Sequence, residues 1–477
     1  MPHQRFEAWP PIHLKAGALG GDLARHLHAD VNGIVQNAVQ KVNVSQRKDR
    51  RIPPIGRVET VPLHWTLDDN GVRFPGWTLD DNEASTSSDA DTLDVRYWLV
   101  EDYFNKSDTS APIFLGLGGE GAVDGEIVQC PQLASSYGAL CVITEHRFYG
   151  KSWPANRSLD AFKKGLWVEQ SLADTSAIID AVQAAYSPAG PRPIVTFGGS
   201  YSGALCAWHR QAYPDQTAGC VAQSAVVQAI YDFPGMDTRA RTVIASPDGG
   251  ECLASLQATY AALSANRTDA QFATLLQRFN ASNLATTPLG KLDFAFSTAD
   301  AALMLVQYGQ KAALCEHMLK LGPGASDNER ISQFLSLIKT HYGGGFMGAC
   351  AHNSQCLRVN AGKVDNNLSW WWQTCSQLGY LQRSPEWDEN AWGSEPFDAP
   401  LRSKNITFPA LVGQCDYLFG KGTGAAGATA NRAFNGRFGG SRPRSRSPPN
   451  LNPSPSHTIG PILKPETSRP PPLAAQS

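Results

Sequence analysis

The chain has 477 residues, of which 42% are hydrophobic and 18% charged, and its formal net charge is −2. This length predicts two domains, or one large domain that carries an insertion. The nearly balanced charge gives no reason to expect a nucleic-acid or membrane-surface partner, and no apolar run approaches the roughly 18 residues of a membrane-spanning helix.

Residues 1–50 form an N-terminal segment with no clear place in a core, although their apolar residues recur at roughly helical spacing. The segment lacks the apolar stretch of a signal peptide. Either the true start lies upstream of Met1 or the protein is not secreted, and we favour the first. Residues 82–92 are polar, which predicts a surface loop.

From residue 96 onward the pattern becomes strand, turn and helix, and residues 51–229 are expected to form the first part of an α/β domain. Strands are predicted within 111–121, 138–150, 191–203 and 218–227, and helices within 171–186 and 204–215, where Leu172, Ile178, Ile179 and Val182 share one helical face. This alternation predicts a parallel sheet that is covered on both faces.

Residues 230–385 change character, and helical periodicity at 252–265, 269–279 and 329–342 predicts a helical cap inserted into the sheet domain. Residues 386–440 are expected to return to the main domain. The last segment, 441–477, contains ten prolines and almost no apolar periodicity. Such a segment cannot bury enough surface to offset its ordering entropy, so we expect it to be disordered.

The cysteine content indicates the compartment. The chain has ten cysteines and no CxxC pair, which argues against a zinc or thioredoxin-type site. An even number of cysteines predicts disulfides in an oxidising compartment, the alternative being scattered buried thiols. Asn-X-Ser/Thr triplets, which accept glycans in secreted proteins, agree with the first reading. They begin at Asn43, Asn105, Asn156, Asn266, Asn280, Asn367 and Asn405.

The strongest chemical signal is the run Gly198-Gly199-Ser200-Tyr201-Ser202-Gly203, which joins a predicted strand to a predicted helix. A nucleophilic serine on such a turn has strained backbone angles, and small neighbours prevent clashes. We therefore predict that Ser200 is the nucleophile and that the Tyr201 backbone N–H helps to hold an oxyanion. The alternative is a glycine-rich turn without catalytic use.

A second oxyanion donor is expected from the loop after an earlier strand, where Gly118-Gly119-Glu120-Gly121 stands. Gly119 is the predicted donor, and a plain strand-ending turn is the alternative. The carboxylate of Glu120 is a further candidate for contact with a substrate amine.

Six blocks in one order carry a family resemblance: 118–121, 145–154, 172–174, 198–215, 370–382 and 415–420. Together they resemble the family of lysosomal prolyl carboxypeptidase, dipeptidyl peptidase II and thymus-specific serine protease, over about residues 95–440. The resemblance implies an α/β-hydrolase fold with a helical cap and Ser200 as nucleophile. It also implies a secreted or lysosomal exopeptidase without cofactor or metal, which cleaves short peptides beside proline from either end; a homodimer stays open.

The triad's Asp and His stay unassigned. In the resembled family both lie beyond the block that corresponds to residues 435–440, where this chain enters its proline-rich tail. His457 has the composition of a solvated tail around it, His146 is expected to be structural, and His209 is expected to lie too far along the helix from Ser200. The C-terminal part of the sheet domain is then missing, and we expect impaired activity. The alternative function is an inactive relative that binds peptides or proteins.

Overall fold

The computed structural model describes residues 58–64, 92–123, 129–154, 157–360, 365–385, 403 and 405–438. The predicted N-terminal segment 1–50, most of the predicted loop 82–92 and the predicted disordered tail 441–477 lie outside these ranges. So do the sequon residues Asn43 and Asn156, and His457. A strand already begins at Thr92, the last residue of the predicted loop.

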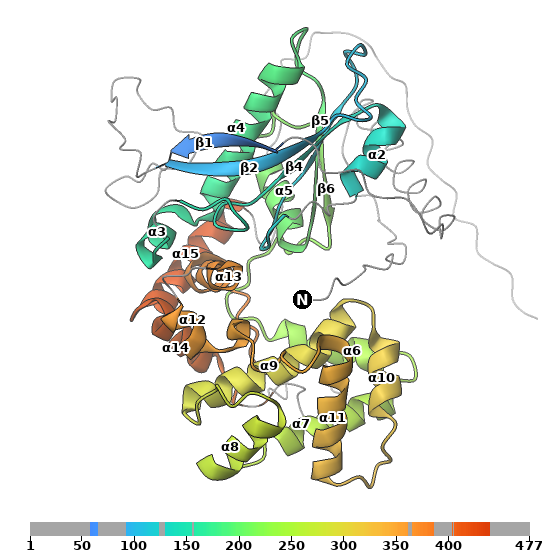
Figure 1. Ribbon diagram of the computed structural model, residues 1–477, viewed down its shortest axis with the longest axis vertical. Helices are drawn as coiled ribbons and strands as arrows, with labels where there is room; N and C mark the ends of the chain where they lie inside the picture. Colours follow the sequence, from blue (N-terminus) through green and yellow to red (C-terminus); the bar gives the residue numbers. More distant parts are fainter. Residues whose placement is uncertain are drawn as a thin grey trace, which may run out of the picture. The chain divides into compact units, whose positions relative to one another are not determined.

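A six-stranded mixed sheet in the order β1-β2-β4-β3-β5-β6 organises the first half of the chain (Figure 1). The strands are β1 (Val58–His64), β2 (Thr92–Val100), β3 (Ile113–Gly116), β4 (Leu140–Thr144), β5 (Ile194–Gly199) and β6 (Gly219–Gln223). β4, β3, β5 and β6 run parallel, whereas β2 pairs antiparallel with both β1 and β4. This strand order, with its crossover connections, is that of an α/β-hydrolase fold, as predicted.

The central strands β3 and β4 are buried on both faces, and side chains alternate between the two faces along each strand. On β3, Ile113 and Leu115 belong to the main core, whereas Phe114 belongs to a second cluster on the opposite face together with Ile143. The helices of this half are α2 (Gln129–Tyr137), α3 (Leu159–Gly165), α4 (Val168–Tyr186) and α5 (Ser200–Ala212). The predicted apolar face of α4, including Leu172 and Val182, is buried as expected.

Helices dominate from residue 235 onward. They are α6 (Gly235–Ala245), α7 (Gly250–Leu263), α8 (Asp269–Arg278), α9 (Pro288–Gln307), α10 (Lys311–Met318), α11 (Asp327–Tyr342), η2 (Cys350–His352) and α12 (Ser354–Val359). Three of them, α7, α8 and α11, match the predicted helices. α9 is the longest and was not predicted. Thr268 and Ser326 begin α8 and α11 with capping boxes, in which side chain and backbone satisfy each other's free groups.

The remaining elements are α13 (Asn366–Gln373), the π-helix η4 (Thr374–Leu378), α14 (Phe408–Phe419) and α15 (Thr423–Phe438). α13 is bonded to the sheet-bearing half: Ser369 Oγ donates to Phe148 O at 2.8 Å, and Trp372 Nε1 donates to Leu166 O at 3.2 Å. The proposed cap range of 230–385 includes α13, although these bonds tie it to the turn after β4 and to the end of α3. The domain boundaries stay a proposal.

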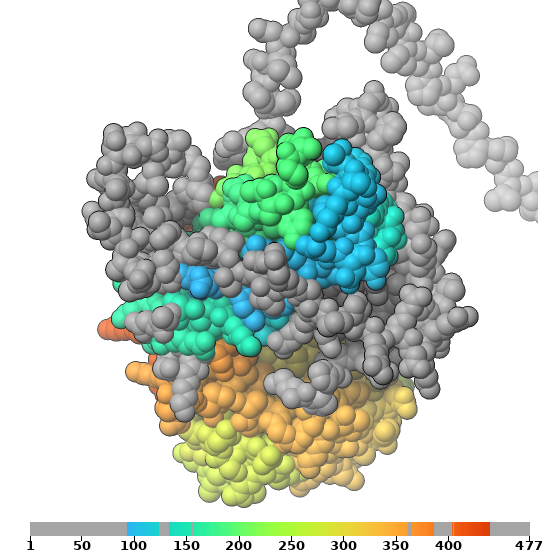
Figure 2. Space-filling model, turned by 45° about the horizontal axis from the view of Figure 1, so that its top comes forward, coloured from blue at the N-terminus to red at the C-terminus, as the bar shows by residue number. Residues whose placement is uncertain are grey.

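In the view of Figure 2, blue-to-green residues of the sheet half and yellow-to-orange residues of the later helices lie over different parts of the face. Residues after Phe438 are not described, so the predicted loss of a later part of the sheet is not tested. Within the described residues β6 has one strand neighbour, β5. In the same ranges, no helix combines the length and the apolar character needed to cross a membrane.

The predicted disulfides are present. Four bridges are described, Cys206–Cys220, Cys252–Cys315, Cys350–Cys356 and Cys375–Cys415, and Cys141 is also disulfide-bonded. No described cysteine is free. A bridge stabilises a fold mainly by restricting the unfolded chain, and a longer loop gains more. Of the four, Cys252–Cys315 closes the longest loop, with a separation of 63 residues, and it joins α7 to α10.

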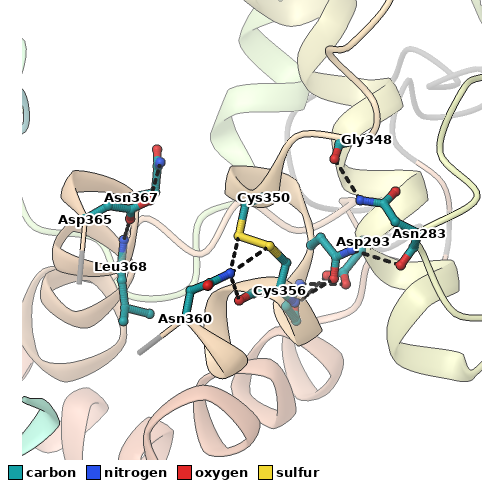
Figure 3. The surroundings of a disulfide bond; sticks show 11 residues. Asn283, Asp293, Gly348, Cys350, Cys356, Asn360, Asp365, Asn367 and Leu368 are labelled. Carbon is teal, nitrogen blue, oxygen red and sulfur yellow. Dashed lines mark hydrogen bonds between the residues drawn. A yellow bond between two sulfur atoms is a disulfide. The ribbon is translucent and has the colours of Figure 1, made fainter. Parts of the chain in front are cut away.

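The short bridge Cys350–Cys356 lies at a polar corner of the helical region (Figure 3). The amide nitrogen of Asn360 points to this bridge, at 3.2 Å from the Cys356 sulfur and 2.9 Å from the Cys356 carbonyl oxygen. Asn283 donates to Gly348 O at 2.8 Å, which ties the loop before η2 to the segment after α8. The corner is therefore fixed by a covalent bond and by amide side chains together.

Candidate active site

Ser200 stands at the junction of β5 and α5, where the chain turns sharply from strand to helix. Its φ of 55° lies in the left-handed region, which a residue with a Cβ rarely adopts. Ser200 is exposed, whereas Tyr201 and Ser202 after it are buried. The junction thus holds one hydroxyl toward solvent at the amino end of a helix, in a strained conformation that often marks a functional residue.

Small residues are required around this turn. A Cβ on Gly198 would lie 2.2 Å from Ser202 O, and a Cβ on Gly203 would lie 2.9 Å from Gly198 O. Ser202 closes the turn, since its Oγ donates to Gly199 O at 2.8 Å and accepts from Gly199 N at 3.0 Å. These contacts give a physical reason for the glycine-rich run that the sequence shows.

The loop after β3 is held against the same turn. A Cβ on Gly118 would lie 2.5 Å from Thr144 O, so the loop passes close to the end of β4. The Cβ position of Gly119 lies 3.5 Å from Ser202 Cβ, in ordinary contact with the first turn of α5. The structure therefore brings the Gly119 loop together with Ser200 and Tyr201. Their role as oxyanion donors stays a prediction.

Glu120 follows in this loop, and its side chain reaches solvent. Surrounding protein nevertheless raises the pKa of the Glu120 carboxyl by desolvation. Desolvation also raises the pKa values of Tyr149, Tyr201 and Tyr308, and the charge of Glu120 adds a smaller rise. These tyrosines lie after β4, on α5 and after α9. Among the described residues no ion pair neutralises Glu120. An accessible carboxylate beside the nucleophile turn is compatible with the predicted contact to a substrate amine, which stays a prediction.

The two histidines nearest in sequence to the turn are buried. His146 contacts Tyr201, with 3.1 Å between Nε2 and the phenol oxygen, and burial lowers the pKa of His146 to about 3. His209 lies nine residues after Ser200, or about 13 Å along a helix, and stacks on Tyr213. Burial lowers the pKa of His209 to about 4. Within the described ranges, no histidine is hydrogen-bonded to the Ser200 hydroxyl.

Asp416 also has a structural partner: its Oδ1 accepts a hydrogen bond from Gly424 N at 2.9 Å, between α14 and α15. The triad's Asp and His stay unassigned among the described residues.

The sequence pattern of the family described as "Serine carboxypeptidase S28" matches residues 81–447, which is most of the chain. The chain belongs to this family. The match includes the Gly119 loop, the Ser200 turn and all of the later helices, and it confirms the resemblance seen in the six sequence blocks.

Named relatives of this S28 chain include serine proteases from plants and animals. It is 32% identical to "Probable serine protease EDA2" of Arabidopsis thaliana over 341 residues, 68% of this chain and 64% of the relative. It is 32% identical over 191 residues to "Thymus-specific serine protease" of Mus musculus, covering 39% of this chain and 37% of the relative. It is 25% identical over 318 residues to "Lysosomal Pro-X carboxypeptidase" of Homo sapiens, covering 60% of this chain and 61% of the relative. The chain thus spans less than two thirds of each relative's length.

Solved structures give weak overall superpositions. An acylaminoacyl peptidase of Pyrococcus horikoshii matches with a TM-score of 0.24 at 14% identity, over 36% of this chain and 24% of that one. An arylesterase matches with a TM-score of 0.25 at 15% identity, over 47% of this chain and 64% of that one. The fold assignment of the S28 chain rests instead on its own strand order and on the turn at Ser200.

An aromatic wall, defined as Trp370, Tyr380 and Phe233, stands beside the turn and was not assigned a role from sequence. Trp370 lies 5.5 Å from the Tyr201 ring and stacks on Tyr380, with 6.4 Å between centroids and an interplanar angle of 15°. Phe233 meets Tyr380 edge-on at 6.5 Å. All three are half-buried. The aromatic run at 370–372, just before a Gly-Tyr pair, was the available sequence signal.

The backbone that presents Tyr380 is unusual. The π-helix η4 precedes it, Gly379 has a φ of 79°, and Tyr380 itself has a φ of 55°. A Cβ on Gly379 would lie 2.2 Å from Tyr231 Cα, so glycine is required there. π-Helical turns and strained residues concentrate at functional sites. The segment 374–380 therefore belongs to the candidate site on geometric grounds.

Proposed function

We propose that this S28 chain carries the nucleophile and oxyanion site of a serine-type exopeptidase. The observation that carries the proposal is the conformation of Ser200, an exposed serine with a φ of 55° at the amino end of α5. In this role Ser200 Oγ attacks the peptide carbonyl carbon, the amine leaves, and water later hydrolyses the acyl-enzyme. The backbone N–H groups of Tyr201 and Gly119 are the proposed donors to the oxyanion.

The proposed substrates are short peptides with proline near one end. Support comes from the aromatic wall of Trp370, Tyr380 and Phe233, which is half-buried and adjoins Tyr201. A proline ring is compact and apolar, so it gains by packing on an aromatic face from which water is displaced. Lysosomal Pro-X carboxypeptidase, whose name states such a preference, is among the relatives. Whether cleavage proceeds from the amino or the carboxyl end stays open.

The proposed location is extracellular or lysosomal, as a glycoprotein. The described disulfides support an oxidising compartment. The described sequon residues are all exposed, as attachment of a glycan requires: Asn105, Asn266, Asn280, Asn367 and Asn405.

The second candidate function is a peptide- or protein-binding relative without catalysis. The observation that favours it is that no described histidine is hydrogen-bonded to Ser200, because a serine hydroxyl is a weak nucleophile without a base. The expected impairment of this chain, by contrast, is part of the first function, because the triad's Asp and His are not assigned among the described residues.

Labelling with a fluorophosphonate probe separates the two functions. The probe forms a covalent bond to an activated serine, so a peptidase is labelled and Ser200→Ala abolishes the label. Peptide mass spectrometry should place the adduct on the fragment that contains Ser200. A folded chain that is not labelled, or a Ser200→Ala variant that is labelled equally, contradicts the peptidase proposal and favours the binding function.

A further inference from the structure

Four buried polar side chains form a hydrogen-bonded chain beneath the turn, here named the Tyr201 chain: Tyr149, Gln373, Tyr201 and His146. Tyr149 Oη donates to Gln373 Oε1 at 2.5 Å, and Gln373 Nε2 donates to Tyr201 Oη at 2.7 Å. His146 Nε2 lies 3.1 Å from Tyr201 Oη. None of the four is more than 5% exposed. Buried polar groups need partners, and here they find them in one another.

The positions of the hydrogens in the Tyr201 chain follow from the bond at its His146 end. His146 Nδ1 lies 2.6 Å from Arg147 O, and a carbonyl oxygen can only accept, so Nδ1 carries a hydrogen. Burial lowers the pKa of His146 to about 3, so the ring is neutral at the pH of any cellular compartment and Nε2 has a free lone pair. Tyr201 must therefore donate its one hydroxyl hydrogen to His146 Nε2.

This donation also fixes the amide of Gln373. With its own hydrogen already used, Tyr201 Oη can only accept a further bond, so it must face the amide nitrogen of Gln373 and not the oxygen. The amide oxygen then receives the hydrogen of Tyr149. Each donor has one acceptor, and the chain runs in one direction from Tyr149 to the Arg147 carbonyl. A reversed amide would leave Tyr201 and Gln373 acceptor to acceptor.

Aromatic rings hold the same tyrosine from other sides. The Tyr201 ring lies 5.5 Å from Trp370, 6.4 Å from Trp208 and 5.5 Å from the His146 ring. Trp370 and Gln373 both belong to α13, and His146 follows β4. The side chain next to Ser200 is thus anchored by two hydrogen bonds and by rings from α13, from the turn after β4 and from its own helix α5.

We propose that the Tyr201 chain is a positioning device for the oxyanion site, an inference that rests on the proposed function. Tyr201 supplies the predicted oxyanion donor through its backbone N–H, and its side chain has almost no freedom to move. A donor that is fixed before the reaction needs no reorganisation when the negative charge develops. His146 and Gln373 are positioning residues that act through Tyr201.

The same geometry argues against His146 as the general base for Ser200. Its Nε2 lone pair is occupied by the Tyr201 hydroxyl, and its Nδ1 hydrogen is bonded to Arg147 O. A base for Ser200 would need a free lone pair within reach of the Ser200 hydroxyl. His146 should therefore affect the rate without adding its own titration to the pH profile.

The test uses the 477-residue chain and the variant Tyr201→Phe, which keeps the ring and removes the shared hydroxyl. We expect the rate constant of fluorophosphonate labelling at Ser200 to fall by about 10- to 100-fold, a part of what loss of a whole oxyanion donor causes. The matched control is Tyr103→Phe, a tyrosine that is 41% exposed, which should leave the rate unchanged. A folded Tyr201→Phe variant that has a lower melting temperature but the original labelling rate overturns the proposal.

Variants of His146 add a rescue and a coupling test. His146→Gln retains an acceptor for Tyr201 and should keep most of the labelling rate, whereas His146→Leu should match the loss in Tyr201→Phe. His146→Leu and Tyr201→Phe both remove the hydrogen bond between His146 and Tyr201. The double variant His146→Leu/Tyr201→Phe should therefore be labelled no more slowly than either single variant. Additive losses, or a labelling rate whose dependence on pH shifts in His146→Gln, contradict a positioning role.

A measurement independent of catalysis distinguishes failure of this inference from failure of the proposed function. Amide hydrogen exchange of the peptide spanning 196–206 should quicken in Tyr201→Phe and His146→Leu, while exchange in α11 stays the same. If the chain is not labelled at all but this local quickening occurs, the peptidase proposal fails and the anchoring of Tyr201 stands. Unchanged exchange in both variants overturns the anchoring itself.

Discussion

Ser200 and Tyr380 share an unusual property at the residue scale: each has a φ of 55° despite carrying a side chain. Such a conformation costs on the order of 1–3 kcal/mol, so the surroundings must enforce it. At Ser200 the enforcement comes from Ser202, which closes the turn by two bonds to Gly199, and from the anchored Tyr201. These contacts hold the hydroxyl in its exposed position in spite of the strained backbone.

Neighbouring glycines of this turn differ sharply in their freedom, which gives a first prediction. Gly198→Ala should destabilise the fold by at least about 2 kcal/mol, because the new Cβ would lie 2.2 Å from Ser202 O. Gly199→Ala should cost less than about 1 kcal/mol, because its Cβ would meet nothing closer than Gln223 O at 3.9 Å. Thermal unfolding of the two variants measures this difference, and equal losses contradict the proposed packing of the turn.

At the scale of elements, the contact between α15 and η4 shapes the candidate site. Asn431 on α15 donates to the carbonyl oxygens of Gln377 and Leu378, at 2.9 and 3.0 Å. Gln377 and Leu378 end η4, so their carbonyl oxygens have no partner within the helix, and these bonds satisfy them. The bridge Cys375–Cys415 ties η4 to α14 as well. The strained segment that presents Tyr380 therefore depends on helices near the end of the described chain.

A matched pair of glycines on α15 tests this dependence. Gly427→Ala would place a Cβ 1.8 Å from Cys375 O, so we expect a loss of more than about 2 kcal/mol. Gly436 lies on the same helix, and a Cβ added there would meet nothing within 4 Å. Gly436→Ala should therefore stabilise the helix by about 0.5–1 kcal/mol. Urea unfolding of both variants measures the two effects. A tolerated Gly427→Ala would show that α15 does not pack closely on η4.

At the scale of the whole molecule, buried ionisable groups give stability a dependence on pH. Asp293 on α9 accepts bonds from Ser354 Oγ on α12 at 2.7 Å and from Gln414 Nε2 on α14 at 2.9 Å. Burial raises the pKa of Asp293 from 3.8 to about 6, in spite of these bonds. Asp293, Ser354 and Gln414 line a small cavity of about 10 Å³, and His352 lines it as well. Three helices thus meet at one carboxyl group.

The direction of this pH dependence follows from the linkage between proton binding and folding. The folded pKa of Asp293 exceeds the unfolded one, so its contribution to stability is fully present below about pH 4 and is lost as the pH rises through 6. Asp293→Asn removes this dependence. We therefore expect the melting temperature of the variant, relative to the original chain, to be more favourable at pH 7.5 than at pH 4.5.

The original chain and Asp293→Asn must be compared at each pH, because His146 and His209 change the stability with pH in the opposite direction to Asp293. Burial lowers both of their pKa values, so the stability that they contribute is present above about pH 6.5 and is lost in acid. These contributions cancel in the difference between the original chain and Asp293→Asn. An identical difference at pH 4.5 and 7.5 contradicts the raised pKa of Asp293.

Features that depend on local order along the chain could be predicted from the residues alone. The α/β alternation, the strand that ends at Gly199 and the helices α4, α5, α7, α8 and α11 follow from periodicity and glycine turns. Ser200 was found because strand, turn and helix are consecutive. The six blocks led to the family that the comparison confirms. α9 was missed, since its residues are apolar on most sides and give little periodicity.

Which distant residues meet at the turn became clear from the folded chain and not before. Gln373 lies 172 residues after Tyr201 and bonds to its hydroxyl, and Trp370 is equally remote in sequence. The protonation of His146 was likewise decided by burial and by the Arg147 carbonyl. Local patterns carry no record of such contacts, because hydrogen bonding and desolvation depend on which surfaces folding brings together.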